Sequence, residues 1–185
     1  MNLPTYVTCL RILFIPVFVI FYYLPWIWAQ LIAVILFILA ALTDLLDGYL
    51  ARKLQQTSKF GAFLDPIADK LMIAVALILL VANPRLPYLA IPIAVMIGRE
   101  IAISGLREWM AELGKRASVA VSFLGKTKMV AQVIAIIFLL LSLPLTSPFY
   151  LAVGYIAIYL AAVLTLWTMV LYIKAAWPEF KLNSK

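Results

Sequence analysis

The stretch that decides the fold runs from Met129 to Ile173 and reads MVAQVIAIIFLLLSLPLTSPFYLAVGYIAIYLAAVLTLWTMVLYI, without a single charged residue. Each half approaches or exceeds the roughly 20 apolar residues that a helix needs to cross about 30 Å of hydrocarbon. The segment 144–148 between the halves contains two prolines and two hydroxyl residues, which is typical of a turn. Because lipid cannot satisfy backbone N–H and C=O groups, such unbroken apolar runs predict helices rather than strands.

Similar apolar runs recur along the whole chain of 185 residues, of which 66% are hydrophobic and 12% charged. A soluble domain is nearer half apolar and a quarter charged, so the composition indicates lipid as solvent. We therefore predict an all-α integral membrane protein with one membrane domain over residues 1–185. Its six predicted transmembrane helices are Val7–Tyr23, Ile32–Tyr49, Ala62–Ala82, Leu89–Ser104, Met129–Leu143 and Tyr150–Ile173.

The basic residues alternate between the two sides of the predicted bundle. The turns near residues 24–30 and 142–148 carry no Lys or Arg, and the turn near 83–87 carries only Arg85. Most other basic residues lie at the opposite ends of the spans, which by the positive-inside rule predicts that both termini face the cytoplasm. Arg11 lies inside the first apolar run, so we expect this run to be a retained helix rather than a cleaved signal.

The scarce reactive residues exclude several kinds of chemistry. The chain has no His, which excludes a Ser-His-Asp triad, a His-ligated metal and an imidazole base. Its one cysteine, Cys9, excludes a disulfide within the chain and a multi-cysteine metal site. An enzyme of this composition must use carboxylates, Lys, Arg, hydroxyl groups or a hard metal ion.

Four of the eight acidic residues fall in one stretch, across the end of the second predicted helix and the start of the third: Asp44, Asp47, Asp65 and Asp69. The first two are three residues apart and the last two are four apart, so each pair shares a helix face. The small residues Gly48, Ala51 and Gly61 lie near these faces and leave room for a ligand or for close helix approach.

Four neighbouring carboxylates in a membrane protein require compensation, because each would otherwise cost several kcal/mol. Salt bridges to nearby Arg and Lys would account for one or two of them, but not for two pairs at helical spacing. One or two Mg²⁺ or Mn²⁺ ions fit better, because these ions prefer oxygen ligands and are completed by substrate phosphates. The residues thus predict metal-dependent phosphoryl chemistry that opens toward the cytoplasm.

The spacing D-x-x-D-G-x-x-A-R, eight further residues, and G-x-x-x-D-x-x-x-D resembles the signature of the CDP-alcohol phosphatidyltransferase family. It is carried here by Asp44, Asp47, Gly48, Ala51, Arg52, Gly61, Asp65 and Asp69. The opening from Asn2 to Pro16 and the segments 98–100, 105–115 and 124–128 resemble members of this family that use sn-glycerol 3-phosphate as acceptor.

This resemblance implies a role for each matching residue. Asp44 and Asp65 would bridge two metal ions, Asp47 would bind one of them, and Asp69 would bind the other and act as general base. CDP-diacylglycerol would lie against the residues Leu3, Pro4, Thr5, Tyr6, Gly48, Ala51, Arg52, Ser58 and Gly61.

The acceptor's phosphate requires cationic donors, for which Arg99, Arg107 and Lys126 are the candidates. Arg offers two parallel N–H donors to a phosphate, and Lys offers a mobile point charge. For Arg99, which lies inside an apolar span, an ion pair with Glu100 or an Asp is the competing structural explanation.

The implied reaction transfers the phosphatidyl group from CDP-diacylglycerol to sn-glycerol 3-phosphate and releases CMP. The resemblance further implies a homodimer in the bacterial cytoplasmic (inner) membrane. Two alternatives stay open: a sister transferase with another acceptor, such as serine or inositol phosphate, and a divalent-cation transporter whose pathway is lined by the same carboxylates.

Overall fold

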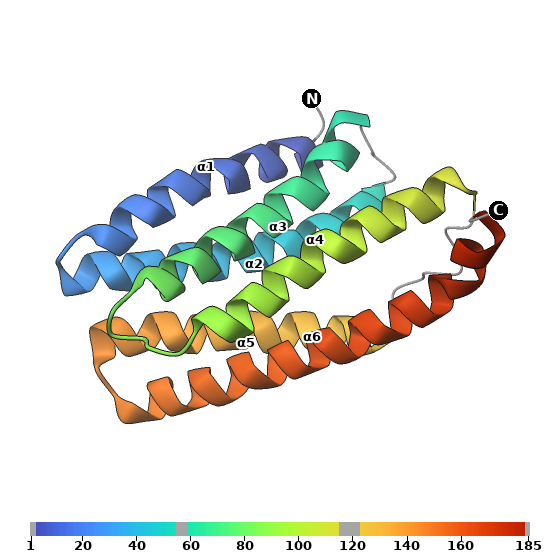
Figure 1. The fold of residues 1–185 in the computed structure, drawn as a ribbon. Helices are drawn as coiled ribbons and strands as arrows, with labels where there is room; N and C mark the ends of the chain where they lie inside the picture. The colour runs from blue at the N-terminus through green and yellow to red at the C-terminus, as the bar shows by residue number, and fades with distance from the viewer. Residues whose placement is uncertain (1–2, 55–58, 115–122, 184–185) are drawn as a thin grey trace.

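In the computed structural model the described residues form six helices that run back and forth along one bundle (Figure 1). The structure describes residues 3–54, 59–114 and 123–183, and within them the side chains of residues 8–43, 64, 67–68, 70–114 and 127–177. The helices are α1 (Leu3–Tyr23), α2 (Ile27–Leu54), α3 (Lys59–Ala82), α4 (Ala90–Glu112), α5 (Phe123–Leu145) and α6 (Pro148–Asn183).

The predicted all-α class is confirmed for these ranges, and each helix contains most or all of one predicted span. Most helices extend past the predicted span, and α6 continues beyond Ile173 to Asn183. The reason is that hydropathy marks only the apolar part of a helix, whereas Lys, Arg, Glu and Gln at its ends are also good helix formers.

Two of the described helical segments, Thr127–Leu145 and Pro148–Trp177, are long and apolar enough to cross a membrane. Three shorter segments are also apolar, namely Thr8–Tyr23, Ile27–Thr43 and Lys70–Ala82. The helix α4 falls in neither set, and it carries Arg99, Glu100 and Arg107 within its length.

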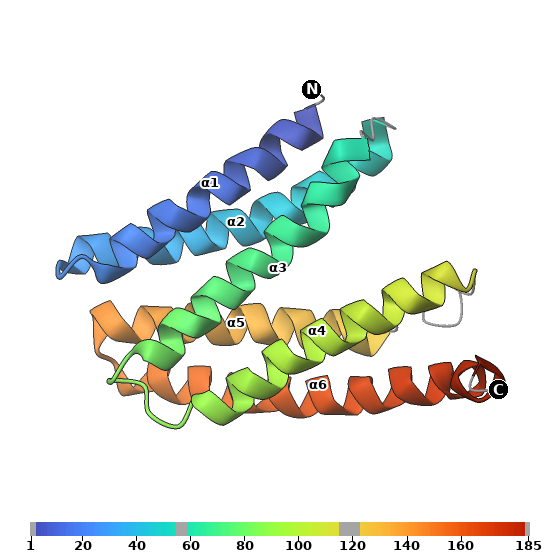
Figure 2. The same ribbon diagram turned by 45° about the horizontal axis from the view of Figure 1, so that its top comes forward.

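Successive helices are antiparallel, so the connections divide between the two ends of the bundle (Figure 1). The turns after α1, α3 and α5 lie at the left end, while both termini lie toward the other end. The helices α1, α2 and α3 pack together, α6 packs along α5 and α4, and α5 also contacts α2 (Figure 2). The last turns of α2 and the first turns of α3 consequently lie at the same end of the bundle as the last turns of α4.

The core is apolar and draws on all six helices, through buried residues such as Phe18, Phe37, Leu77, Met96, Leu140 and Ile158. The closest approach of α5 and α6 depends on a glycine. A Cβ atom added at Gly154 would lie 2.8 Å from the side chain of Leu139 and 3.1 Å from its backbone nitrogen.

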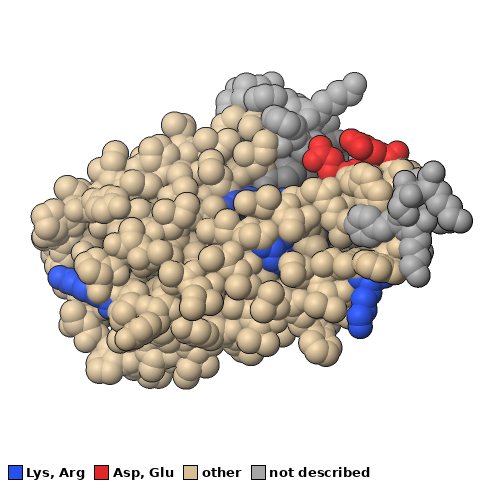
Figure 3. Space-filling model, viewed as in Figure 1, with Lys and Arg blue, Asp and Glu red and all other residues tan. Residues whose placement is uncertain are grey.

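The outer surface is also apolar. Large side chains such as Ile91, Ile156 and Val163 are exposed over more than half of their surface. The view in Figure 3 is mostly neither acidic nor basic, and the acidic side chains drawn in it gather at the right-hand end. An apolar surface of this extent is typical of a protein surrounded by lipid.

Candidate active site

A cavity of about 690 Å³ lies between α3, α4, α5 and α6. This volume is within the range of roughly 300–1,000 Å³ that is usual for small-molecule sites. Its apolar lining comes from Ile73, Ala74, Leu77, Met96, Ile97, Ile101 and Met129, and its polar lining from Lys70, Arg99, Glu100, Ser104, Arg107, Lys128, Gln132 and Tyr172.

The cavity is strongly cationic. Among the lining residues whose side chains the structure describes, four carry a positive charge and only Glu100 carries a negative one, which gives these residues a formal charge of +3. Inside an apolar bundle such a charge is poorly solvated and favours an anionic ligand. The ligand that this lining fits is a small anion with several acceptor oxygens, such as a phosphate monoester.

Arg99 lies in the interior, with 7% of its surface exposed. Its Nη1 donates to Glu100 Oε2 at 3.4 Å, and its Nη2 donates to Thr168 Oγ1 on α6 at 3.2 Å. Its Nε is buried and has no acceptor among the described residues. An unsatisfied buried donor costs about 1–3 kcal/mol, so this N–H is a natural partner for a ligand oxygen.

Arg107 lies two turns further along α4 and contacts the same tyrosine as Arg99. Its Nη2 donates to the hydroxyl of Tyr172 at 2.9 Å, and its guanidinium carbon lies 5.2 Å from the centre of the Tyr172 ring. The guanidinium carbon of Arg99 lies 5.4 Å from that ring centre. Both arginines expected to bind the acceptor are therefore brought together in one cavity.

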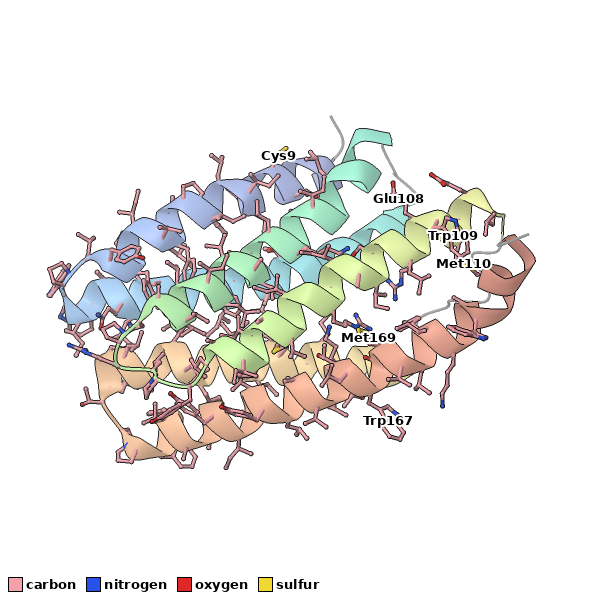
Figure 4. The ribbon with its side chains drawn as sticks, viewed as in Figure 1. Cys9, Glu108, Trp109, Met110, Trp167 and Met169 are labelled. Atoms are coloured by element: carbon pink, nitrogen blue, oxygen red, sulfur yellow. The ribbon has the colours of Figure 1, made fainter. Side chains whose placement is uncertain are left out.

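A small apolar cluster of Ile103, Met110, Tyr172 and Ala176 packs between α4 and α6, and its Tyr172 also lines the cavity. Met169 packs against this cluster and lies between α4 and α6 in Figure 4. Trp167, two residues earlier on α6, points away from the bundle.

Lys128 and Lys70 join the cavity from the neighbouring helices. Lys128 of α5 is 5% exposed and donates to Glu100 Oε2 at 3.1 Å. Lys70 of α3 donates to the hydroxyl of Ser104, which in turn donates to the carbonyl of Glu100 at 2.6 Å. The predicted ion pair of Arg99 with Glu100 is thus present, but Glu100 is shared with Lys128 and cannot neutralise the whole cavity.

The motif residues lie on helices at one end of the bundle. Asp44, Asp47, Gly48, Ala51 and Arg52 fall in the last turns of α2, and Gly61, Asp65 and Asp69 fall in the first turns of α3. Their side chains lie outside the described part of the structure, and the predicted metal contacts stay a prediction. Among the side chains that are described, no group of three potential metal ligands occurs.

The chain connects this motif directly to the cationic cavity. Lys70, which lines the cavity, follows Asp69 in sequence, so their Cα atoms are about 3.8 Å apart. Asp69 also precedes the lining residue Ile73 by one helical turn on α3. The predicted base therefore lies on the part of α3 that leads into the cavity.

For the remaining predicted site residues the structure describes the backbone at most. Residues 3–6 form the first turn of α1, and Lys126 lies in the first turn of α5, with their side chains outside the described set. Ser58 lies outside the described residues.

Four contributors were not on the list of predicted site residues: Lys70, Lys128, Thr168 and Tyr172. Lys70 could have been found from its position next to Asp69. For Lys128 the sequence left two interpretations open, attraction of a phosphate and contact with lipid headgroups, since basic residues at span ends often face the headgroups. Tyr172 resembles an interfacial anchor, and no local pattern distinguishes it from the exposed Trp177.

The protein is thus a helical bundle in which α2 and α3 carry four Asp of one motif and α3 also lines a cationic cavity. The family profile described as CDP-alcohol phosphatidyltransferase matches residues 1–167, and the chain belongs to this family. It is 48% identical over 183 residues to a Yersinia enterocolitica protein named CDP-diacylglycerol–glycerol-3-phosphate 3-phosphatidyltransferase, covering 97% of each chain.

Proteins of the same name from Sodalis glossinidius and Pectobacterium atrosepticum are 50% and 51% identical, over 95% of this chain in both cases. The family and these relatives identify the protein as a transferase of phospholipid biosynthesis.

Proposed function

We propose that the protein transfers the phosphatidyl group of CDP-diacylglycerol to sn-glycerol 3-phosphate, giving phosphatidylglycerophosphate and CMP. It would thus act as a phosphatidylglycerophosphate synthase, in the synthesis of phosphatidylglycerol and cardiolipin. The names of its relatives support both substrates. The structural observation that carries the proposal is the cationic cavity, which suits an acceptor that bears a phosphate.

The phosphate of the acceptor would bind between Arg99, Arg107 and Lys128. Forked guanidinium donors match phosphate oxygens, and the buried Nε of Arg99 would gain an acceptor. Lys126, in the first turn of α5, would add a further positive charge near the entrance. A dianionic phosphate would offset most of the excess positive charge that Glu100 leaves in the cavity.

The carboxylates of the motif fit two Mg²⁺ or Mn²⁺ ions, because they provide only hard oxygen donors. Asp44 and Asp65 would hold both ions, with Asp47 on one and Asp69 on the other. When bound, such ions neutralise the negative charge that develops on the diphosphate and on departing CMP.

The acceptor's hydroxyl oxygen would attack the phosphorus that carries the diacylglycerol, and the bond from this phosphorus to the oxygen of CMP would break. Asp69 would accept the hydroxyl proton, since the chain has no His and Asp69 precedes the lining residue Ile73 by one turn of α3. Arg52, Gly48, Ala51, Ser58, Gly61 and residues 3–6 would hold the CDP portion.

The apolar helices and outer surface support a membrane protein. We extend this to an inner-membrane protein in which all six helices span the bilayer, because apolar runs recur along the whole sequence. The distribution of basic residues supports cytoplasmic termini, with the active site at the cytoplasmic ends of α2 and α3. We further propose a homodimer, as the family resemblance implies.

A panel of acceptors tests the proposal. The purified protein with Mg²⁺ and CDP-diacylglycerol is supplied with sn-glycerol 3-phosphate, glycerol, serine or inositol phosphate, and CMP release is measured. We expect CMP release with sn-glycerol 3-phosphate and with none of the other three acceptors. Equal release with inositol phosphate would make the protein a sister transferase, and no release with any acceptor would contradict the proposal.

The positive charge of the cavity also distinguishes the proposed function from two alternatives, a serine acceptor and a divalent-cation transporter. Serine carries no phosphate and would leave the cationic side chains of the cavity uncompensated, so a serine acceptor fits poorly. A divalent-cation transporter would require a cation pathway, whereas the described cavity is positively charged and would repel such an ion. Metal flux into proteoliposomes without any nucleotide would support the transporter instead.

A further inference from the structure

We propose that Tyr172 of α6 is a positioning residue, which holds Arg99 and Arg107 at the separation and orientation that an acceptor phosphate requires. The inference rests on the proposed function, because it assigns this task within the acceptor site. It concerns a residue outside the aspartate motif, on a helix that carries none of the predicted site residues.

The side chain of Tyr172 contacts two cations. The ring is buried, with 5% of the residue exposed, and the guanidinium carbons of Arg99 and Arg107 lie 5.4 and 5.2 Å from its centre. The phenol oxygen accepts a hydrogen bond from Arg107 Nη2 at 2.9 Å. One side chain thus contacts both arginines, through its ring and, for Arg107, also through its hydroxyl group.

The second fixed point on α6 is Thr168, four residues before Tyr172 and hence on the same helix face. Its hydroxyl donates to the carbonyl of Thr165 at 3.0 Å and accepts from Arg99 Nη2 at 3.2 Å. Because its own hydrogen is committed to Thr165, its lone pairs are available to Arg99. The guanidinium of Arg99 is therefore held at one end by Thr168 and beside the ring of Tyr172.

Fixing the arginines before the ligand arrives matters for affinity. Two guanidinium groups in one cavity repel each other, and each long side chain loses rotamer freedom when it is immobilised by a ligand. The negative face of an aromatic ring attracts both cations, and a hydrogen bond fixes the direction of one of them. A phosphate would then bind to donors that are already in place.

The test compares Tyr172→Phe with the wild-type enzyme in the acceptor-dependent release of CMP. Loss of the hydroxyl should raise the KM for glycerol 3-phosphate about fivefold to tenfold, a factor within the range of one ordinary hydrogen bond, because the hydroxyl acts on the phosphate only through Arg107. The kcat and the KM for CDP-diacylglycerol should stay within about twofold. Tyr172→Leu, which also removes the ring, should raise the KM for glycerol 3-phosphate further.

Inorganic phosphate provides a second measurement on the same protein, as a competitive inhibitor against glycerol 3-phosphate. Its inhibition constant should rise by the same factor as the KM, because both report the phosphate contacts. The matched control is Tyr159→Phe on the same helix, whose hydroxyl donates to the backbone carbonyl of Tyr88 at the opposite end of the bundle. It should change neither constant.

Three outcomes would overturn the inference: a wild-type KM and phosphate inhibition constant in Tyr172→Phe, a fall in kcat without a change in either constant, or an equal effect of Tyr159→Phe. If Tyr172→Phe does not fold, Thr168→Val tests the same idea, and it should raise both constants through Arg99. Failure of the proposed function is distinguishable, because the wild-type protein would then release no CMP with glycerol 3-phosphate, while thermal stabilisation by inorganic phosphate would still report on Tyr172.

Discussion

At the scale of single residues, the proposed function assigns different roles to Asp69, as the base, and to the arginines of α4, as ligands of the acceptor phosphate. We expect Asp69→Asn to lower turnover by about 10²- to 10⁴-fold, because the acceptor hydroxyl loses its base. Much of the binding of CDP-diacylglycerol should remain. Arg107→Ala should instead mainly raise the KM for glycerol 3-phosphate, and steady-state kinetics with both substrates varied separates the two patterns. Near-normal turnover in Asp69→Asn would show that another group is the base.

Glu100 is the counter-ion of two cavity side chains, since its Oε2 accepts from both Arg99 and Lys128. In Glu100→Gln this negative charge disappears, while Lys128 stays buried. We expect the protein without ligand to lose about 1–3 kcal/mol of stability. A phosphate anion would replace the lost charge, so the rise in melting temperature on adding inorganic phosphate should be larger than in the wild type.

The control for this variant is Glu112→Gln, at the exposed end of α4, which should leave both melting temperatures unchanged. If Glu100→Gln melted like the wild type and gained no more from phosphate, Glu100 would not be the counter-ion of the cavity.

The sequence predicts those site residues that belong to a local pattern, such as a spaced motif, and misses those that join the site only through tertiary packing. The four Asp and the glycines follow a spaced motif, and Arg99 is conspicuous because it interrupts an apolar run. Thr168 and Tyr172 lie about 70 residues from the arginines that they contact, and only the packing of α6 on α4 brings them together. Contacts of this kind follow from tertiary packing, which one sequence does not reveal.

At the scale of helices, apolar runs predicted the existence and order of all six, but not their ends. The polar ends of α4 and α6 continue the helix without contributing hydropathy. Pro144 was expected to belong to a turn and instead lies within α5, which ends one residue later at Leu145. The close contact of Gly154 on α6 with Leu139 on α5 was not predicted either, because no sequence pattern places these two residues opposite each other.

That contact gives a prediction for the pair α5 and α6. In Gly154→Ala the new Cβ would meet Leu139 at 2.8 Å, including atoms near the backbone, so one helix must shift. We expect a loss of about 1–3 kcal/mol in the free energy of unfolding. The matched control is Gly105→Ala on α4, where nothing lies within 4 Å of the added atom. It should be neutral or stabilise by up to about 1 kcal/mol. Equal effects of the two variants in detergent unfolding would contradict the close contact.

At the scale of the whole molecule, the orientation in the membrane decides which compartment supplies the acceptor. The two ends of α4 provide exposed positions at opposite ends of the bundle, Tyr88 just before the helix and Glu112 at its last turn. The turn that contains Tyr88 carries only Arg85 as a basic residue, whereas the opposite end holds most of the Lys and Arg. The positive-inside rule therefore predicts that Tyr88 faces away from the cytoplasm.

Cysteine labelling measures this orientation directly, because Cys9 is the only native cysteine and can be replaced by Ser. In that background, we expect a membrane-impermeant thiol reagent to label Tyr88→Cys in spheroplasts. It should label Glu112→Cys only after the membrane is permeabilised. The reverse pattern would put the cationic cavity and the Asp motif on the outer side, away from any cytoplasmic pool of a phosphorylated acceptor. Equal labelling of both positions in intact spheroplasts would contradict a membrane-spanning α4, because its two ends could then not lie on opposite sides of the bilayer.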